Sequence, residues 1–244
     1  MPKRRNYKIG GIYHIYNRGI DKKKIFLDYG DHERFINNFF VFNDVNSNVN
    51  LVNNSYHFKN CVKGKIKRIN KVEKDCRSLF VEVLSFCLMP NHFHLLLRPK
   101  VEDGIQKFMQ KFISGYSLYF NDKYERSGPL FQGRYKDVPV EDDNHFNWLP
   151  YYIHCNPLDL KFPSWRKGNL KDMKKAIFFL DHYRWSSHLF YLGENHFPLL
   201  VQKDFLKDDL GLGDDYFNNF KEWLSNKKSF NNVSEDVILE SKYV

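Results

Sequence analysis

Two histidines two positions apart, His92 and His94, have the residue type and the spacing to do chemistry. They open the apolar segment HFHLLLRP, which predicts a strand, and side chains two apart on a strand project from the same face. Two imidazoles about 6–7 Å apart on one face could bind a single divalent ion. The same pair also fits two ordinary hydrogen-bonded strand residues, so it does not identify a site by itself.

A metal site needs a third ligand, and the candidates are Asn156, His154, His145, His14 and several acids. Asn156 stands directly before a proline in the segment YYIHCNP, where a helix is predicted to end. Tyr152 lies four residues earlier, so the two side chains would share one face of that helix. A phenol beside a metal-bound amide could be a nucleophile, because the ion favours the phenolate and neutralises charge on a phosphate. The alternative is a core or capping tyrosine beside a simple helix end.

Other tyrosines compete with Tyr152 for the role of nucleophile. Tyr116 and Tyr119 lie on the apolar stripe of a predicted helix, which indicates packing in the core. Tyr151 points about 100° away from Tyr152 on a helix of 3.6 residues per turn. Pro150 should kink the helix or mark its first turn, so the orientation of Tyr152 depends on where the helix starts.

The elements around these residues predict an α+β fold. In chain order they are a strand near 10–16, a helix over 31–42, hairpin strands over 80–88 and 92–99, a helix over 105–120, an extended segment over 127–140, a helix over 143–155 and a last helix near 216–224. This order predicts helices packed on one face of a small antiparallel sheet. A basic, Asn-rich insertion over about 43–78 is either a solvated loop or a flap that contacts phosphates.

The composition indicates a folded protein with a polyanionic partner. The 244 residues include 38 Lys+Arg against 29 Asp+Glu, and the net charge of +9 favours a polyanion without specifying which one. Hydrophobic residues make up 42% of the chain, which is enough to bury a core. Because there is no long apolar run and no signal peptide, we expect a cytoplasmic protein with no membrane partner. The four cysteines form no CxxC pair and are expected to be plain thiols.

Five segments resemble a known family of enzymes. The segment CLMPNHFHLLLRP resembles the HUH motif of the single-tyrosine HUH transposases. The segments YHIYNRGIDKKKIF, SGPLFQGRYK, YYIHCNP and HYRWSSHLFYLG resemble REP-associated tyrosine transposases in the same order. On this basis we divide the chain into a catalytic domain over 1–193, which includes the basic insertion at about 43–78, and a C-terminal helical extension and tail over 194–244. The resemblance implies a ferredoxin-like core.

The resemblance also implies a reaction. His92 and His94 would bind Mg²⁺ or Mn²⁺, Asn156 would supply the third protein ligand, and Tyr152 would be the catalytic tyrosine. The enzyme would cut and rejoin single-stranded or hairpin DNA through a 5′-phosphotyrosine intermediate. We expect it to act as a monomer in the cytoplasm, associated with the nucleoid. Arginine and glutamine side chains reach base edges and phosphates, and the candidate DNA contacts are Asn17, Arg18, Gln132 and Arg134.

The chain departs from the family pattern after Asn156-Pro157. There it reads LDLKF instead of a small, basic run, which puts DNA contacts of that segment in doubt. Two alternative functions fit the same residues. The first is a replication initiator or relaxase that uses the same chemistry to nick a plasmid origin. The second is a non-catalytic single-stranded DNA-binding module that relies on aromatic stacking and lysines.

Overall fold

The computed structural model describes residues 6–46, 77–141, 143–194, 197, 199–202 and 215–226. Most of the basic insertion predicted over 43–78 lies outside these residues, as does most of the predicted C-terminal extension over 194–244. The side chain of His145, one of the candidate third ligands, is also outside the described part of the structure.

Four antiparallel strands form one sheet, β1 (Ile12–Arg18), β2 (Val81–Met89), β3 (His92–Pro99) and β4 (Lys136–Val140). Their order across the sheet is β2-β3-β1-β4. Helix α1 (Tyr29–Phe42) lies between β1 and β2 in the chain, and helix α3 (Gly104–Lys123) lies between β3 and β4. This β-α-β-β-α-β order is ferredoxin-like, so the predicted α+β fold class is confirmed.

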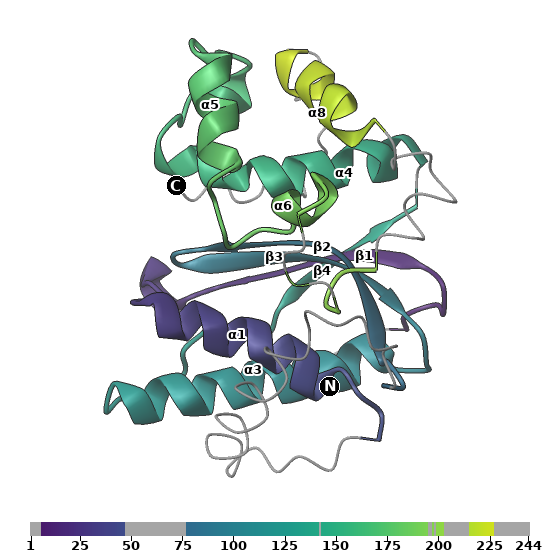
Figure 1. The fold of residues 1–244 in the computed structure, drawn as a ribbon. Helices are drawn as coiled ribbons and strands as arrows, with labels where there is room; N and C mark the ends of the chain where they lie inside the picture. The colour runs from purple at the N-terminus through teal and green to yellow at the C-terminus, as the bar shows by residue number, and fades with distance from the viewer. Residues whose placement is uncertain are drawn as a thin grey trace.

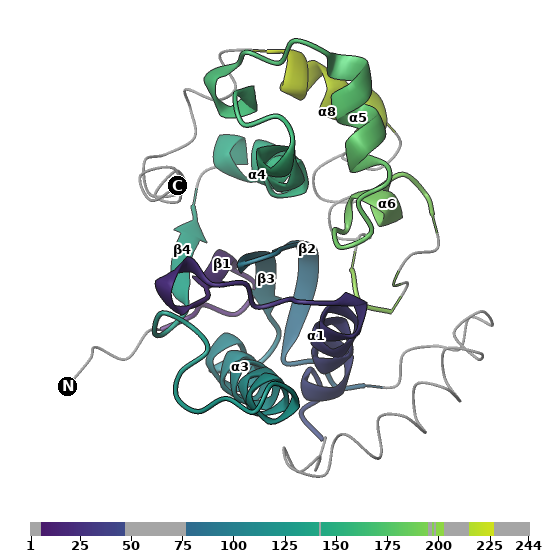
Figure 2. The same cartoon turned by 90° about the vertical axis from the view of Figure 1, so that its left-hand side faces the viewer.

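Helices cover both faces of this sheet (Figures 1 and 2). Helices α1 and α3 lie on one face, whereas α4 (Asp143–Cys155) lies on the other. The sequence predicts that the helices pack on one face of the sheet. This prediction is correct for α1 and α3 but wrong for α4. The reason lies in β3, where every residue except Arg98 is buried. A strand that is buried on both faces needs a layer of structure on each side.

Five further helices follow α4 in the described part of the chain, namely η2 (Asn156–Leu160), η3 (Trp165–Lys167), α5 (Met173–Leu180), α6 (His188–Tyr191) and α8 (Tyr216–Ser225). The predicted last helix is α8, and it packs on α4. The ring of Tyr151 lies 5.6 Å from that of Tyr216 and 5.9 Å from that of Phe220. A chain division at residue 193 stays a prediction. No described helix combines the length and apolar character that a membrane crossing needs.

Aromatic rings fill the layer between the sheet and helices α1 and α3. Phe112 of α3 lies 4.5 Å from Phe35 and 4.6 Å from Phe39 of α1, measured between ring centroids. Phe93 of β3 joins this layer at 5.2 Å from Phe35. Because side chains alternate along a strand, Phe93 on this face leaves its two histidine neighbours on the face that α4 covers.

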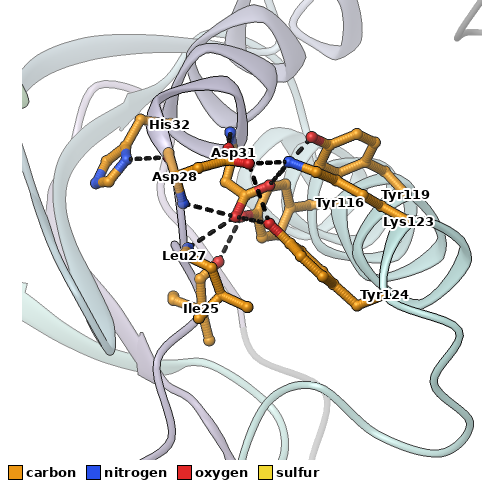
Figure 3. A network of polar contacts seen from close by, with 9 residues as sticks. All are labelled: Ile25, Leu27, Asp28, Asp31, His32, Tyr116, Tyr119, Lys123 and Tyr124. Atoms are coloured by element: carbon orange, nitrogen blue, oxygen red, sulfur yellow. Dashed lines mark hydrogen bonds and ion pairs between the residues drawn. The ribbon is translucent and has the colours of Figure 1, made fainter.

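A polar network fastens the start of α1 to the end of α3 (Figure 3). The helix begins before the predicted position 31, because Asp28 caps it by accepting a hydrogen bond from the backbone N–H of Asp31. Asp31 is fully buried and accepts hydrogen bonds from Lys123 Nζ and from the Tyr124 hydroxyl, both at 2.7 Å. Burial lowers the pKa of Lys123, but its hydrogen bonds to Asp28 and Asp31 outweigh this effect and raise that pKa above its ordinary value.

Candidate active site

The two histidines of β3 lie side by side beneath α4. The ring centroids of His92 and His94 are 5.2 Å apart and the ring planes are nearly perpendicular, at 83°. His94 is fully buried and His92 nearly so. The ring of Tyr152 on α4 lies 6.5 Å from that of His94. Two segments that lie far apart in the sequence therefore bring the predicted histidine pair and the predicted tyrosine together.

Hydrogen bonds fix the orientation of both histidine rings. Nδ1 of His94 lies 2.9 Å from Nε2 of His14, and Nδ1 of His92 lies 2.6 Å from the side-chain oxygen of Asn91. The other nitrogen of each ring, Nε2, is buried. Since the hydrogen bond at one nitrogen determines which nitrogen can bind a metal, Nε2 is the metal-binding atom that this arrangement favours. His14, a candidate third ligand, instead holds His94.

Tyr152 lies on α4 and Asn156 is the first residue of η2, which follows α4 directly, and both side chains contact the same guanidinium, that of Arg166. The helix starts at Asp143, so Pro150 lies within it and does not form its first turn. Asn156 is fully buried at the start of η2, and its Nδ2 donates a hydrogen bond to the backbone oxygen of Tyr152 at 2.9 Å. The amide side chain is thereby folded back against α4.

An arginine that the sequence analysis does not predict, Arg166 of η3, joins these two residues. Its Nη1 donates to the hydroxyl of Tyr152 at 2.5 Å, and its Nη2 donates to Oδ1 of Asn156 at 2.8 Å. Asp159 accepts from Nε and Nη2 of the same guanidinium, with a closest distance of 2.6 Å. The signal in the sequence is the acid of LDLKF, Asp159, because a nearby cation stabilises a partly buried carboxylate.

The candidate metal ligands fit a divalent ion only in part. The two imidazoles are adjacent and oriented, which suits metal binding. Oδ1 of Asn156, however, accepts a hydrogen bond from a cation, Arg166. Within the part of the chain that the structure describes, no three His, Cys, Asp or Glu side chains are grouped so as to hold a metal ion. The role of Asn156 as third ligand stays a prediction.

The remaining candidate ligand, His154, belongs to a buried network at the other side of α4. Its Nδ1 lies 2.7 Å from the Tyr216 hydroxyl, and its Nε2 lies 2.7 Å from Oγ of Ser187. Burial, with a smaller contribution from His188, lowers the pKa of His154 well below its ordinary value. His154 therefore fastens α8 and the segment before α6 to α4.

The rival tyrosines have structural contacts. Tyr116 donates to the backbone oxygen of Ile25 at 2.5 Å, and Tyr119 donates to Asp31 at 3.1 Å. Tyr151 packs against α8, and burial is the main cause that raises its pKa to about 12. A hydroxyl that resists losing its proton is a poor nucleophile.

The four predicted DNA contacts separate into two groups. Arg18 of β1 pairs with His92 of β3, and cross-strand partners project from the same face. Gln132 and Arg134 are exposed, and the backbone N–H of Gln132 donates to the backbone oxygen of Arg18 at 2.9 Å. Arg18 therefore lies on the face of the histidine pair and Gln132 lies next to the end of its strand, whereas Arg134 lies beside α3. Asn17 pairs with Phe93 on the opposite face and donates to the backbone oxygen of Gly133 at 3.1 Å, which is a structural role.

A groove of about 340 Å³ adjoins Arg134, between α3 and the segment that leads into β4. Its lining is mixed, polar and apolar, and comprises Gln106, Met109, Gln110, Ile113, Ser114, Gly133, Arg134 and Tyr135. It lies beside helix α3, on the side of the sheet away from α4, so the groove is separate from the histidine pair.

Comparison with known proteins agrees with the sequence resemblance. Residues 50–156 match the family model described as "Transposase IS200 like". No curated protein matches the chain. One solved structure, described as the REP-associated tyrosine transposase bound to a REP hairpin, covers 83% of this chain and 91% of its own, with 11% identity and a TM-score of 0.41. The match to the family model confirms the resemblance to transposases, and the segment that carries His92, His94, Tyr152 and Asn156 is similar to the IS200-like transposase family.

Proposed function

We propose that the protein is a transposase-like enzyme that cleaves and rejoins single-stranded or hairpin DNA, with Tyr152 as its nucleophile. The observation that carries the proposal is the position of Tyr152. Its ring lies 6.5 Å from that of His94, and its hydroxyl accepts a hydrogen bond from Arg166 at 2.5 Å. The similarity of residues 50–156 to IS200-like transposases supports the same reaction class.

In the proposed step, the Tyr152 oxygen attacks the phosphorus of a phosphodiester and loses its proton. A new bond forms between the tyrosine oxygen and phosphorus, the bond from phosphorus to the 3′ oxygen breaks, and the leaving 3′ oxygen takes up a proton. The product is a 5′-phosphotyrosine and a free 3′-OH. The guanidinium of Arg166 stabilises the negative charge that develops on the tyrosine oxygen. A 3′-OH from another strand can reverse the step, because the phosphotyrosine conserves the energy of the phosphodiester.

His92 and His94 would hold a divalent ion, Mg²⁺ or Mn²⁺, and such an ion would neutralise charge on the scissile phosphate. The chain prepares these ligands in two ways. His14 and Asn91 hold the two rings, and burial excludes water from both.

Arg18 is the candidate phosphate contact that lies nearest to the histidine pair. It shares a sheet face with His92, and its Nε is buried without a hydrogen-bond partner among the described residues. Gln132 is exposed, and its backbone N–H donates to the backbone oxygen of Arg18. Together with the net charge of +9, these side chains suit a DNA strand that passes beside the histidines.

A covalent-trapping experiment tests the proposal. The protein is incubated with labelled hairpin DNA from the flanks of its own gene, with Mn²⁺ or with EDTA, and separated on a denaturing gel. We expect a metal-dependent adduct with wild type and Tyr151→Phe, and none with Tyr152→Phe. Loss of the adduct in Tyr151→Phe alone would refute the assignment of Tyr152. Tight binding without an adduct in any lane would favour the non-catalytic binding module, whereas cleavage of plasmid-origin DNA alone would favour an initiator or relaxase.

A further inference from the structure

We propose that Arg166 competes with a divalent cation for Oδ1 of Asn156, and that it links Asn156 to Tyr152 until the cation breaks its contact with Asn156. This inference rests on the proposed function, because it assumes that the histidine pair binds a metal.

Arg166 is well placed to link the two residues. Its guanidinium makes hydrogen bonds to three side chains at once: the Tyr152 hydroxyl, Oδ1 of Asn156 and the carboxylate of Asp159. It also lies over the ring of Tyr152, 5.0 Å from the centroid. Asp159 is itself fixed, because it accepts a hydrogen bond from the indole nitrogen of the buried Trp165 at 2.6 Å. The planar fork of an arginine suits such bridging, and a lysine could not reproduce it.

Charge makes this contact incompatible with a metal on the same oxygen. An amide oxygen has two lone pairs, so geometry alone permits two partners. A divalent ion bound at about 2.1 Å from Oδ1, however, would lie within a few ångström of a guanidinium that donates to that oxygen at 2.8 Å. Like charges at such a distance repel strongly in a buried site. Metal binding by Asn156 therefore requires the Arg166 contact to break, while Asp159 keeps the arginine nearby.

Metal affinity gives a test that does not depend on cleavage. Mn²⁺ binding to the full-length protein without DNA is measured from the electron paramagnetic resonance signal of free Mn²⁺. Arg166→Gln should bind Mn²⁺ about tenfold more tightly than wild type, since a charge-assisted hydrogen bond no longer opposes the metal. Lys167→Gln removes one positive charge from the same turn, on an exposed side chain, and should change the affinity less than about twofold.

A double-mutant cycle separates competition at the oxygen from a general effect of charge. In an Asn156→Ala background, Arg166→Gln should leave Mn²⁺ affinity unchanged, because the contested oxygen is gone. A gain in affinity that persists in this background would refute competition at Oδ1. Arg166→Lys provides a second variant if Arg166→Gln does not fold. It retains the charge but not the fork, and its affinity should lie between those of wild type and Arg166→Gln.

His92→Ala distinguishes failure of this inference from failure of the proposed function. If Mn²⁺ binding depends on His92 and wild type forms the Tyr152 adduct, but Arg166→Gln binds Mn²⁺ no more tightly, only the role of Arg166 is wrong. If His92→Ala binds Mn²⁺ as tightly as wild type, the proposed metal site is wrong. The proposed competition for Asn156 is then wrong as well.

Discussion

Nε2 of His14 on β1 lies 2.9 Å from Nδ1 of His94 on β3, so one histidine holds the ring of another across two neighbouring strands. The two rings are nearly parallel, at 14°, with centroids 5.1 Å apart. This contact fixes His94 with Nδ1 engaged, which leaves Nε2 as the nitrogen suited to a metal.

His14→Phe should therefore weaken Mn²⁺ binding about 10- to 100-fold, because the ring of His94 loses its hydrogen-bond partner. The dissociation constant is measured by isothermal titration calorimetry on the protein alone. His182→Gln is the matched control, since His182 is exposed and its contacts are with Phe178, near the end of α5. Equal affinities for His14→Phe and wild type would show that His14 does not orient the site.

The link between α1 and α3 predicts unequal roles for two neighbouring acids. Asp31→Asn should lower the free energy of unfolding by about 2–4 kcal/mol, because Lys123 loses its fully buried anionic partner. Asp28→Asn should cost less than about 1 kcal/mol, since Asp28 is half-exposed and asparagine also caps helices well. Urea unfolding of both variants checks this. A larger loss for Asp28→Asn would contradict the role assigned to Asp31.

Local patterns predicted most of the fold and the histidine pair. The apolar run of β3, the stripe of α3 and the aromatic spacing of α8 are signals within one element, and each element forms where its signal lies. The start of α1 was misplaced because Asp28 and Asp31 are both capping residues, and only the structure shows that Asp28 is the cap.

The second helical layer and Arg166 could not be predicted in the same way. A fully buried strand requires cover on both faces, but no local rule says which later segment supplies it. Arg166 reaches Tyr152 and Asn156 from a three-residue turn, η3, whose position depends on tertiary packing of Trp165. Its role depends on how close η3 lies to α4 and η2 in space. The spacing of residues along the sequence of one helix does not reveal this.

Because His154 is buried, we predict that the free energy of unfolding depends on pH. Its folded-state pKa is lowered by burial, whereas the unfolded chain titrates near the ordinary value of 6.5. Above that pH both states are neutral, and the contribution of His154 to stability is fully present. As the pH falls below about 6.5, the unfolded state binds a proton that the folded state resists, so the free energy of unfolding decreases.

Urea unfolding between pH 7.5 and pH 5 measures this effect. His154→Gln should be less stable than wild type at pH 7.5 but should lose less stability on acidification. His32, whose pKa burial also lowers, is present in both proteins and accounts for part of the remaining slope. Parallel pH profiles for wild type and His154→Gln would show that His154 does not cause the acid sensitivity.

We predict that Arg18 contacts a DNA phosphate beside the histidine pair. Its backbone position is opposite His92, and the +9 charge of the chain predicts that DNA affinity falls steeply with salt. Arg18→Gln should weaken binding of hairpin DNA about tenfold and reduce the slope of log affinity against log salt by about 1, because one phosphate contact is lost. Fluorescence anisotropy at several salt concentrations gives both quantities.

Asn17→Ser is the control for this experiment, since Asn17 is the neighbour of Arg18 but faces the opposite side of the sheet. It should lower stability through loss of the bond to Gly133 while leaving the salt slope unchanged. An unchanged slope in Arg18→Gln, or the same reduction in Asn17→Ser, would remove Arg18 from the DNA-binding surface.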